Sequence, residues 1–401
     1  MTPSDFDSQD PSIWDFDVRP SDEVESSTPT GKVAVIRNSD RATFRRCRRM
    51  WGWNSHLRGN LRPFTTASPL WYGSGFHFAL EDFHGAKNYS SAVEAFWAYV
   101  EATKTFDRRR LPGDWRELTE LGEGMLNYYT KDWLATRDPY KTFVWKGVPQ
   151  VEVNFRIEIP WPEGKYGYDR VVYSGTIDRV VIDSDGLLWF LEYKTAKVIQ
   201  TLHLATDGQV SSYCWAGDYL YPGYKVAGVI YQQHRKDVPR EPKFTNSGLS
   251  IAQNQLTTHQ EFRRALVKIF GSVERAPSKY IQYHTSLVQS EDIDWSKFIR
   301  RDRARRNDHQ RQAEGVKILM ELEEMLNPNT PLYPSPTRDC VHLCSFNGPC
   351  VSMDDGSDWE YELSQLMRPR DKEYDEWRRF LPSQTEITKL QAQVTREQLF
   401  Q

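Results

Sequence analysis

Long hydrophobic runs are absent from this sequence. No stretch approaches the roughly 18 consecutive apolar residues of a membrane span, and the N-terminus lacks the basic start and apolar run of a secretory signal. These absences exclude a membrane-spanning protein and predict a cytoplasmic location. The GxxxxGK(S/T) and complete GxGxxG patterns that bind nucleotide phosphates are also missing, so no nucleotide-driven motor is expected within this chain.

Cysteine is scarce. The 401 residues include five cysteines, an odd number in a chain expected in a reducing compartment, so a disulfide framework is not expected. Three of the five nevertheless lie close together, in the segment CVHLCSFNGPC that spans residues 340–350. Such a group of thiols favours metal ligation, for which a closed tetrahedral site needs a fourth ligand.

Charge of one sign predominates only in the first 30 residues. This segment holds eight acidic residues against one arginine and is rich in Ser, Pro and Thr, which predicts a disordered tail. The rest of the chain carries a net charge of +4, although the whole chain is at −3. Aromatic residues make up 13% of the sequence, with 14 Trp, and such side chains fill cores or stack on nucleic-acid bases.

Hydrophobic periodicity predicts an α/β fold. Residues 39–51, 90–106 and 115–136 have helical spacing, and a strand pattern begins at Val148 and continues in a hairpin of residues 171–183 and 187–194. A helix over 207–220 and a strand over 224–234 follow, and helical patterns return at 250–275 and 300–326. The order of helix, three strands, helix and strand is typical of an α/β core.

The same patterns divide the chain into five parts. We expect a disordered acidic tail, a helical N-terminal part, a core, a basic helical region and a cysteine segment with a C-terminal tail, at residues 1–30, 31–147, 148–240, 241–337 and 338–401.

The predicted hairpin carries two carboxylates where its hydrophobic pattern asks for apolar residues. If Ser184-Asp185-Gly186 forms the turn, paired residue numbers sum to about 370, and Asp178 faces Glu192. Directly opposed side chains lie roughly 4.5 to 5.5 Å apart, where like charges destabilise the pair.

A divalent cation between these carboxylates would reverse that effect. Lys194 projects from the same face as Glu192, because the two residues are two apart on one strand. Oxygen ligands of this kind suit Mg²⁺ or Mn²⁺. The alternative is that both carboxylates lie on the wet face of the sheet with Lys194 as an ion-pair partner.

These residues and their neighbours resemble the core motifs of the PD-(D/E)XK nucleases, in particular the RecB/AddB-type exonuclease group, which includes the CRISPR adaptation nucleases. The similar segments are GSGFHFALE, Gly175-Thr-Ile-Asp178, Glu192-Tyr-Lys-Thr195 and Gln209-Val-Ser-Ser-Tyr213, in the family's order. The resemblance implies a restriction-endonuclease-like fold, that is, a mixed central sheet flanked by helices, with helical additions and a four-cysteine metal staple.

The resemblance also implies roles for individual residues. His77, Asp178 and Glu192 would be metal ligands, joined by the carbonyl of Tyr193, and Lys194 would be the catalytic lysine. The residues that would support the active site or contact the nucleic acid are Gln209, Tyr213, Thr195 and Glu81. Taken alone, His77 is more often a packed or capping histidine, and Gln209 with Tyr213 an ordinary helix face.

The cysteines fit the same group. Cys47 is similar in context to the N-terminal cluster ligand of AddB-type nucleases, so the resemblance implies a [4Fe–4S] cluster held by Cys47, Cys340, Cys344 and Cys350. Cys214 would then be a core residue. Three residues separate Cys340 from Cys344 where the family commonly has two, and a structural Zn²⁺ site is the alternative.

Two arginine groups are candidate phosphate contacts. The first surrounds Cys47, with Trp51 available to stack on bases, and its candidate DNA-binding residues are Arg45, Arg46, Arg48, Arg49 and Trp51. The second is the run RRDRARRNDHQR, from residue 300. A solvated helix face is the alternative in each case.

The sequence thus predicts a metal-dependent deoxyribonuclease, an exonuclease acting on DNA ends or single strands in recombination, repair or replication. A helicase or recombination protein is the expected partner. One alternative is a catalytically idle, metal-stapled subunit that binds single-stranded DNA in a recombination complex. A sequence-specific restriction-type endonuclease on the same core is another, and the cysteine staple and early histidine disfavour it.

Overall fold

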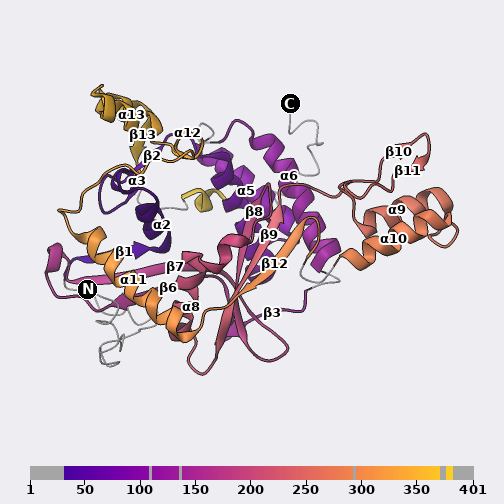
Figure 1. Cartoon of the computed structure of the whole chain (residues 1–401), viewed down its shortest axis with the longest axis horizontal. Helices are drawn as coiled ribbons and strands as arrows, with labels where there is room; N and C mark the ends of the chain where they lie inside the picture. The colour runs from indigo at the N-terminus through magenta and orange to yellow at the C-terminus, as the bar shows by residue number, and fades with distance from the viewer. Residues whose placement is uncertain (1–30, 108–110, 135–137, 292–294, 371–375, 383–401) are drawn as a thin grey trace.

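A mixed β-sheet lies at the centre of the protein, with helices on both faces (Figure 1). The computed structural model describes residues 31–107, 111–134, 138–291, 295–370 and 376–382. The predicted acidic tail, residues 1–30, lies outside the described residues. Within the described part of the chain, no helix is both long and apolar enough to cross a membrane.

The sheet has seven strands, and β7 organises it. Strands β1 (Val33–Arg37), β7 (Arg170–Ile182), β8 (Leu188–Ala196), β9 (Val226–Arg235) and β12 (Ile299–Ala304) follow one another in that order. Strands β3 (Lys141–Thr142) and β6 (Val151–Ile159) also pair with β7. The β1–β7 and β8–β9 pairs are parallel and the others antiparallel, so the predicted mixed central sheet is confirmed.

The predicted hairpin register is also confirmed. Arg179 pairs with Leu191 and Ile182 with Leu188, so paired residue numbers sum to 370. Gly186 has φ +77° in the turn, a left-handed conformation that glycine adopts without the steric cost of a side chain.

The ladder is interrupted along one edge of β7. Strand β1 accompanies β7 only as far as Ser174, and β8 joins it only from Arg179. Between these points β7 has no strand partner on that edge. The carbonyl of Thr176, within this gap, accepts a hydrogen bond from the Tyr213 hydroxyl instead. Asp178 lies at the end of the gap, next to the first pair of the β7–β8 ladder.

Two apolar cores cover the two faces of the sheet. On β8, Leu188 and Phe190 join one core and Trp189 and Leu191 the other, because alternate strand residues point to opposite faces. The first core includes α2 (Asn38–Arg46), α8 (Gly208–Leu220) and α11 (Asp308–Leu326). The second includes α4 (Ser68–Glu81), α5 (Ala92–Asp107), α6 (Trp115–Asn127) and the π-helical η5 (Tyr128–Trp133), and the π-helical η3 (Asp82–Ala86) directly continues α4.

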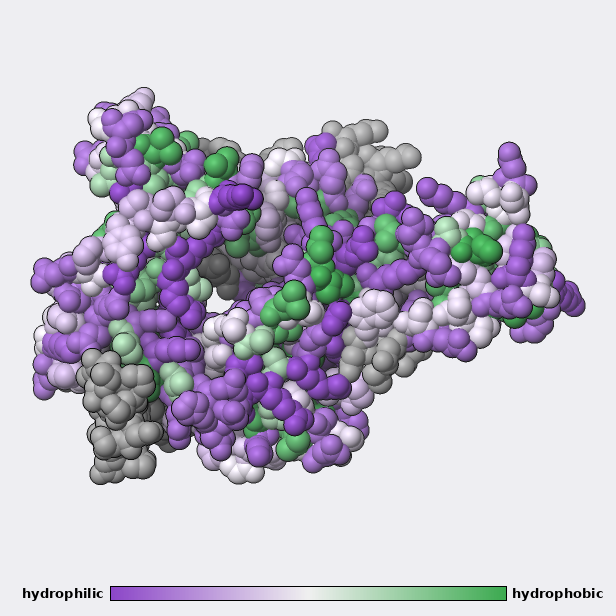
Figure 2. Space-filling model, in the orientation of Figure 1, coloured by the Kyte–Doolittle hydropathy of each residue, from purple (hydrophilic) through white to green (hydrophobic). Residues whose placement is uncertain are grey.

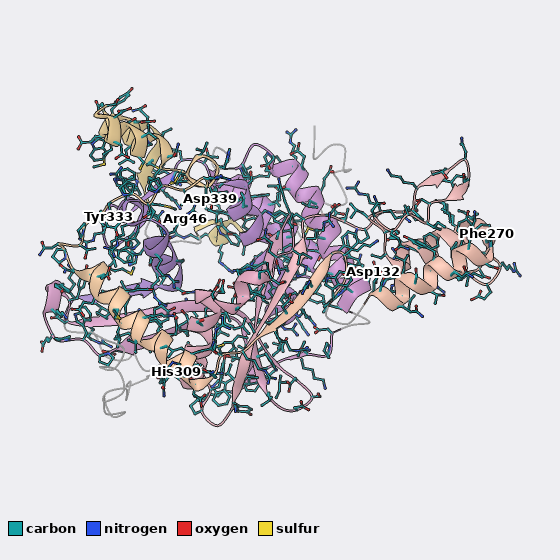
Figure 3. All side chains as sticks on the ribbon, in the orientation of Figure 1. Arg46, Asp132, Phe270, His309, Tyr333 and Asp339 are labelled. Carbon is teal, nitrogen blue, oxygen red and sulfur yellow. The ribbon has the colours of Figure 1, made fainter. Side chains whose placement is uncertain are left out.

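An arm with its own small core projects from the body between β9 and β12 (Figure 1). It consists of β10 (Phe244–Thr245), β11 (Gly248–Leu249), α9 (His259–Phe270) and α10 (Ser278–Ser290). Arg264 pairs with Asp132 at 2.8 Å where the arm meets the body, whereas Phe270 lies near the arm's far end (Figure 3).

The cysteine segment packs against the N-terminal helices. Trp53 of α3 (Arg48–Asn54) contacts Phe346 and Trp359, and β2 (Leu61–Pro63) pairs with β13 (Met367–Pro369). The helices of this segment are α12 (Cys340–Leu343), α13 (Asn347–Asp355) and α14 (Trp359–Leu366). The chain then reaches η8 (Glu376–Phe380), where Trp377 packs on Phe78 and Tyr99.

Short elements complete the described chain. They are the pair β4 (Val144–Trp145) and β5 (Val148–Pro149), and the 3₁₀ turns η6 (Lys165–Gly167) and η7 (Leu202–Ala205).

Three sequence-based assignments differ from the structure. The start of the arginine run at 300 is the strand β12 rather than a helix, because Arg301 and Ala304 are buried at the edge of the sheet. The helix expected around Cys47 is two helices, with Cys47 extended between them at φ −163°. The N-terminal part is not wholly helical, since it contributes β1 to the sheet.

Arg41 of α2 is a structural residue rather than a surface charge. Its side chain is fully buried and pairs with Glu314 at 3.0 Å and Glu321 at 2.7 Å, both on α11. Its guanidinium also donates to the Ser212 hydroxyl at 2.9 Å. The pKa of Arg41 is raised because Tyr173 and the two glutamates outweigh the opposing effect of burial.

Replacing Arg41 by leucine should destabilise the fold strongly. The change leaves Glu314 buried without its counter-charge, and breaking a buried pair in this way costs about 3–5 kcal/mol. Urea unfolding of the variant measures the loss. Arg240→Leu is the control, because its side chain is 67% exposed in a surface pair with Asp237 and should cost below about 1 kcal/mol. Similar unfolding free energies for both variants would contradict this role.

Candidate active site

Three ligand-type side chains converge at the interrupted edge of β7. His77 on α4 lies with Nδ1 3.2 Å from Asp178 Oδ1 and 3.7 Å from Glu152 Oε1. Among the described residues, this is the one group of three or more His, Cys, Asp or Glu side chains whose ligand atoms all lie within 4.8 Å of one another. Burial alone would lower the pKa of His77, but Asp178 and Glu152 raise it well above its usual value.

Glu152 was missed by the sequence analysis. It stands opposite Asp178, since the flanking pairs on β6 and β7 are Val151 with Arg179 and Val153 with Ile177. The pKa of Glu152 is raised, first by burial, and the nearby Asp178 carboxylate adds to the effect. Two carboxylates and an imidazole in this arrangement match the ligand types that hold Mn²⁺ or Mg²⁺.

The backbone at Glu152 is strained. Its φ of +46° is in the left-handed region, which costs a non-glycine residue roughly 1–2 kcal/mol. The neighbouring Val151 packs against Gly85 of η3 so closely that a Cβ on Gly85 would lie 2.2 Å from Val151 Cγ2. This contact holds β6 against η3, which continues the helix α4 that carries His77. The packing of β6 on η3 and its pairing with β7 together bring Glu152 to the site.

Asp178 and Glu192 face each other across the start of the β7–β8 ladder. Asp178 Oδ2 accepts a hydrogen bond from the backbone N–H of Tyr193 at 2.7 Å, which fixes the carboxylate on β8. Burial and then the charge of Asp178 raise the pKa of Glu192 to about 7. One oxygen of Glu192, Oε2, is buried without a hydrogen-bond partner among the described residues, so the residues present fit a cation at this point.

Lys194 and the start of α8 complete the surroundings of Glu192. The Lys194 ammonium contacts Glu192 Oε1 and lies 3.3 Å from Gln209 Oε1. Gln209 Nε2 donates to the same glutamate oxygen at 2.8 Å and to the Tyr213 hydroxyl at 2.9 Å. Burial would lower the pKa of Lys194, but Glu192 and Asp178 raise it above its usual value. The structure thus brings Lys194, Gln209 and Tyr213 together around Glu192.

The remaining candidates of the family motifs lie at the margin of this group. The ring of Tyr193 is buried beside His84, at 6.2 Å between ring centroids. Thr195 follows on β8 and shares the face of Tyr193 rather than that of Lys194. Glu81 accepts a hydrogen bond from Arg378 of η8 at 2.9 Å, so it connects α4 with the C-terminal segment.

The arginines around Cys47 differ in their ion pairs and in their exposure to solvent. Arg48 pairs with Glu324, and Arg49 pairs with Asp354 at 2.7 Å. Arg45 is exposed but also pairs with Glu321 at 3.7 Å, and Arg46 is exposed. Arg45 lies against the residue before Gln209, since a Cβ on Gly208 would be 2.6 Å from Arg45 Nη1. Arg45 is therefore close to the candidate active site.

Two expectations about nucleic-acid contacts are wrong in this conformation. Trp51 is fully buried in the core, where it packs on Phe44, so its ring is not available to stack on bases. In the second arginine group, Arg301, Arg306 and Arg311 are buried and bind protein groups, such as Asp138 for Arg301 at 2.8 Å.

The four predicted cluster cysteines share one region. Cys344 lies close enough to Cys340 and Cys47 that, after burial, both contribute to its raised pKa. Each of the four sulfurs accepts one N–H hydrogen bond, from Met50 for Cys47, Thr337 for Cys340, Phe346 for Cys344 and the Arg49 guanidinium for Cys350. Arg46 and Asp339 mark this region in Figure 3. Cys214 is buried in the sheet core.

Replacing Glu152 separates its metal-binding and conformational effects. Glu152→Gln should weaken Mn²⁺ binding about tenfold or more, measured by isothermal titration calorimetry. Glu152→Gly should weaken it equally but be about 1 kcal/mol more stable than Glu152→Gln without metal, because glycine relieves the positive φ. The control is Glu163→Gln, in an exposed loop. Unchanged Mn²⁺ affinity in both Glu152 variants would refute the assignment.

The comparison with protein families agrees with the fold. A model of the PD-(D/E)XK nuclease superfamily matches residues 39–351, which include His77, Glu152, Asp178, Glu192 and Lys194. A search of curated proteins finds no match. The matched segment covers most of this chain, and the chain therefore belongs to the PD-(D/E)XK nuclease superfamily.

Proposed function

We propose that this protein is a metal-dependent deoxyribonuclease that hydrolyses phosphodiester bonds at DNA ends or in single strands. The superfamily usually hydrolyses such bonds in nucleic acids and uses divalent metals. The observation that carries the proposal is the group of His77, Glu152 and Asp178 beside the Glu192–Lys194 pair. Buried carboxylates this close to one another need a cation or a proton to be stable.

The side chains of the site have separable tasks. His77, Glu152 and Asp178 would hold Mg²⁺ or Mn²⁺, and the resemblance to the family implies Glu192 and the Tyr193 carbonyl as further ligands. When bound, the ion lowers the pKa of a coordinated water and offsets charge on the phosphate. Lys194 stabilises negative charge on the phosphodiester in the transition state. Gln209 and the Lys194 ammonium bind the same oxygen of Glu192 and hold this carboxylate in place.

The basic side chains that remain exposed support a nucleic-acid substrate. Arg45 lies against Gly208 beside Gln209, and Arg46 is exposed at the end of the same helix. Guanidinium groups beside an active site can bind the phosphates of the strand that neighbour the scissile bond. We assign the protein to DNA recombination, repair or replication, with a helicase or recombination protein as its partner.

The cysteine segment would carry a [4Fe–4S] cluster on Cys47, Cys340, Cys344 and Cys350. Hydrogen bonds to ligand sulfurs are typical of such clusters, and N–H groups of Met50, Thr337 and Arg49 donate to the sulfurs of Cys47, Cys340 and Cys350. A tetrahedral Zn²⁺ would hold its sulfurs roughly 3.8 Å apart, given Zn–S bonds of about 2.3 Å. No three of these sulfurs lie within 4.8 Å of one another in the described structure. A structural Zn²⁺ on the same four cysteines is the alternative, and the metal content of the protein distinguishes the two.

The catalytic residues provide the first test. Asp178→Ala and Lys194→Ala should each lower Mg²⁺- or Mn²⁺-dependent cleavage of a linear single-stranded DNA at least about 100-fold, in a gel assay of labelled strands. Lys165→Ala, distant in a surface pair with Glu323, is the control. A circular single strand should resist cleavage if free ends are required. Nuclease activity that survives both active-site changes would overturn the proposal and favour an idle DNA-binding subunit.

The cysteines provide an independent test. Anaerobically purified protein should be brown and absorb near 400 nm, and serine at Cys47, Cys340, Cys344 or Cys350 should abolish this absorption and lower the melting temperature. The reason is that the cluster would join chain segments about 290 residues apart. Cys214→Ser is the control that keeps the absorption. Stoichiometric zinc without iron in the purified protein would refute the cluster and support the zinc site. Unchanged melting temperature and metal content in all four variants would rule out a metal staple.

A further inference from the structure

The connection between β8 and α8 displays two unusually exposed apolar side chains. Val198 is 65% exposed and Leu202 is 97% exposed, and they follow Lys194 by four and eight residues. Single exposed apolar residues are common on protein surfaces and usually need no explanation. These two differ because the loop that carries them is held in place and lies beside the candidate active site.

The loop is anchored at three points. The carbonyl of Ala196 accepts a hydrogen bond from the Lys236 N–H at 2.8 Å. The buried Gln233 side chain accepts from the N–H of Gln200 at 3.0 Å and donates to its carbonyl at 2.8 Å. Leu204 is buried, and its carbonyl accepts from Arg306 at 2.7 Å. Val198 and Leu202 alternate with these anchors, so they cannot turn inward without breaking them.

Aromatic side chains extend this apolar surface toward the catalytic lysine. Tyr231 on β9 is paired with Glu192, and Gln233 with Lys194, so Tyr231 and Lys194 share one face of the sheet. The exposed His203, next to Leu202, packs edge-on against the Tyr231 ring at 5.5 Å. Figure 2 shows an opening through this face of the molecule, with mostly hydrophilic residues around it and a hydrophobic patch over the β8–α8 connection.

We propose that Val198, Leu202, His203 and Tyr231 form a contact surface for the bases of an unpaired strand whose phosphate lies at Lys194. This inference rests on the proposed nuclease function and specifies its substrate. Apolar and aromatic side chains beside a phosphate-binding ammonium match a nucleotide, which has an apolar base face next to a charged backbone. Bases inside a duplex are stacked on each other, so their faces reach this surface only in a single strand.

Charge around the loop favours a nucleic acid over a protein partner. Lys197 lies on the loop itself and is exposed, and it is close enough to Lys236 to contribute, after burial, to the lowered pKa of that lysine. Two ammonium groups at the base of an apolar loop would repel a basic partner and attract the phosphates on either side of a bound base.

Binding to strands with and without bases tests the proposal. The full-length protein is titrated, with Ca²⁺ in place of Mg²⁺, into a labelled 20-nucleotide oligothymidylate and an abasic strand of equal length, and fluorescence anisotropy is recorded. The native protein should prefer the base-bearing strand about tenfold. The variant with Val198→Ser and Leu202→Ser should lose most of this preference by weakening on the base-bearing strand alone. Phe244→Ser, 72% exposed on the arm, should retain it.

No preference in the native protein, equal weakening on both strands, or full preference in the double variant overturns the base-contact surface. The last result is expected if the loop docks a protein instead. A base-dependent preference in a protein that cuts no DNA with Mg²⁺ or Mn²⁺ would support the surface while refuting the nuclease. Cleavage without a base preference would do the reverse.

Discussion

Repulsion among three carboxylates is the constraint around which the candidate site is built. Glu152, Asp178 and Glu192 come from three adjacent strands, and the two ladders bring the first and last to opposite sides of Asp178. Like charges at such positions destabilise a sheet. His77 and Lys194 supply positive charge at two sides of the group, and the orphan oxygen of Glu192 shows that this compensation is incomplete. A bound cation would complete it.

The interruption of the β7 ladder makes this crowding possible. A continuous ladder on that edge would pair residues 175–178 and fill the space in front of Asp178. Because β1 stops at Arg37 and β8 joins only at Leu191, the gap is closed by side chains instead. The Tyr213 hydroxyl binds the carbonyl of Thr176, and the Asp178 carboxylate binds the N–H of Tyr193. The site therefore lies on strands and helices rather than on loops, which fixes its geometry.

The sequence was sufficient for the central strands of the sheet, β6 to β9, and for part of the site. The hairpin register followed from one short turn, since a three-residue loop fixes which residues pair. Glu152 could not be found in the same way, because the connection between β6 and β7 spans residues 160–169 and leaves their register open. Nothing in the local sequence marks its positive φ either. The strand pattern VEVNFRIEI, with Glu at 152 and 158, reads as an ordinary half-exposed strand.

Other failures arose where charge was taken as a sign of exposure. Arg301 and Arg311 are buried because carboxylates or carbonyls from distant elements bind them, as Asp138 binds Arg301 and the Cys214 carbonyl binds Arg311. Such pairs join residues far apart in the chain, so no local pattern reveals them. The break between α2 and α3 at Cys47 was not predicted either. No Pro or Gly marks it, and the nearness of Cys344 to Cys47 appears only in the folded chain.

Helix α2 joins the two metal-binding regions proposed here. Its last residue precedes Cys47, while Arg41 bonds to Ser212 of α8 and Arg45 lies against Gly208 at the start of that helix. Gln209, the next residue, holds Glu192. The position of Cys47 is thus connected to a carboxylate of the candidate active site through two helices and a few direct contacts. A cysteine staple far from the substrate can act on catalysis by this route, since it fixes α2 and, through Arg41 and Arg45, the start of α8.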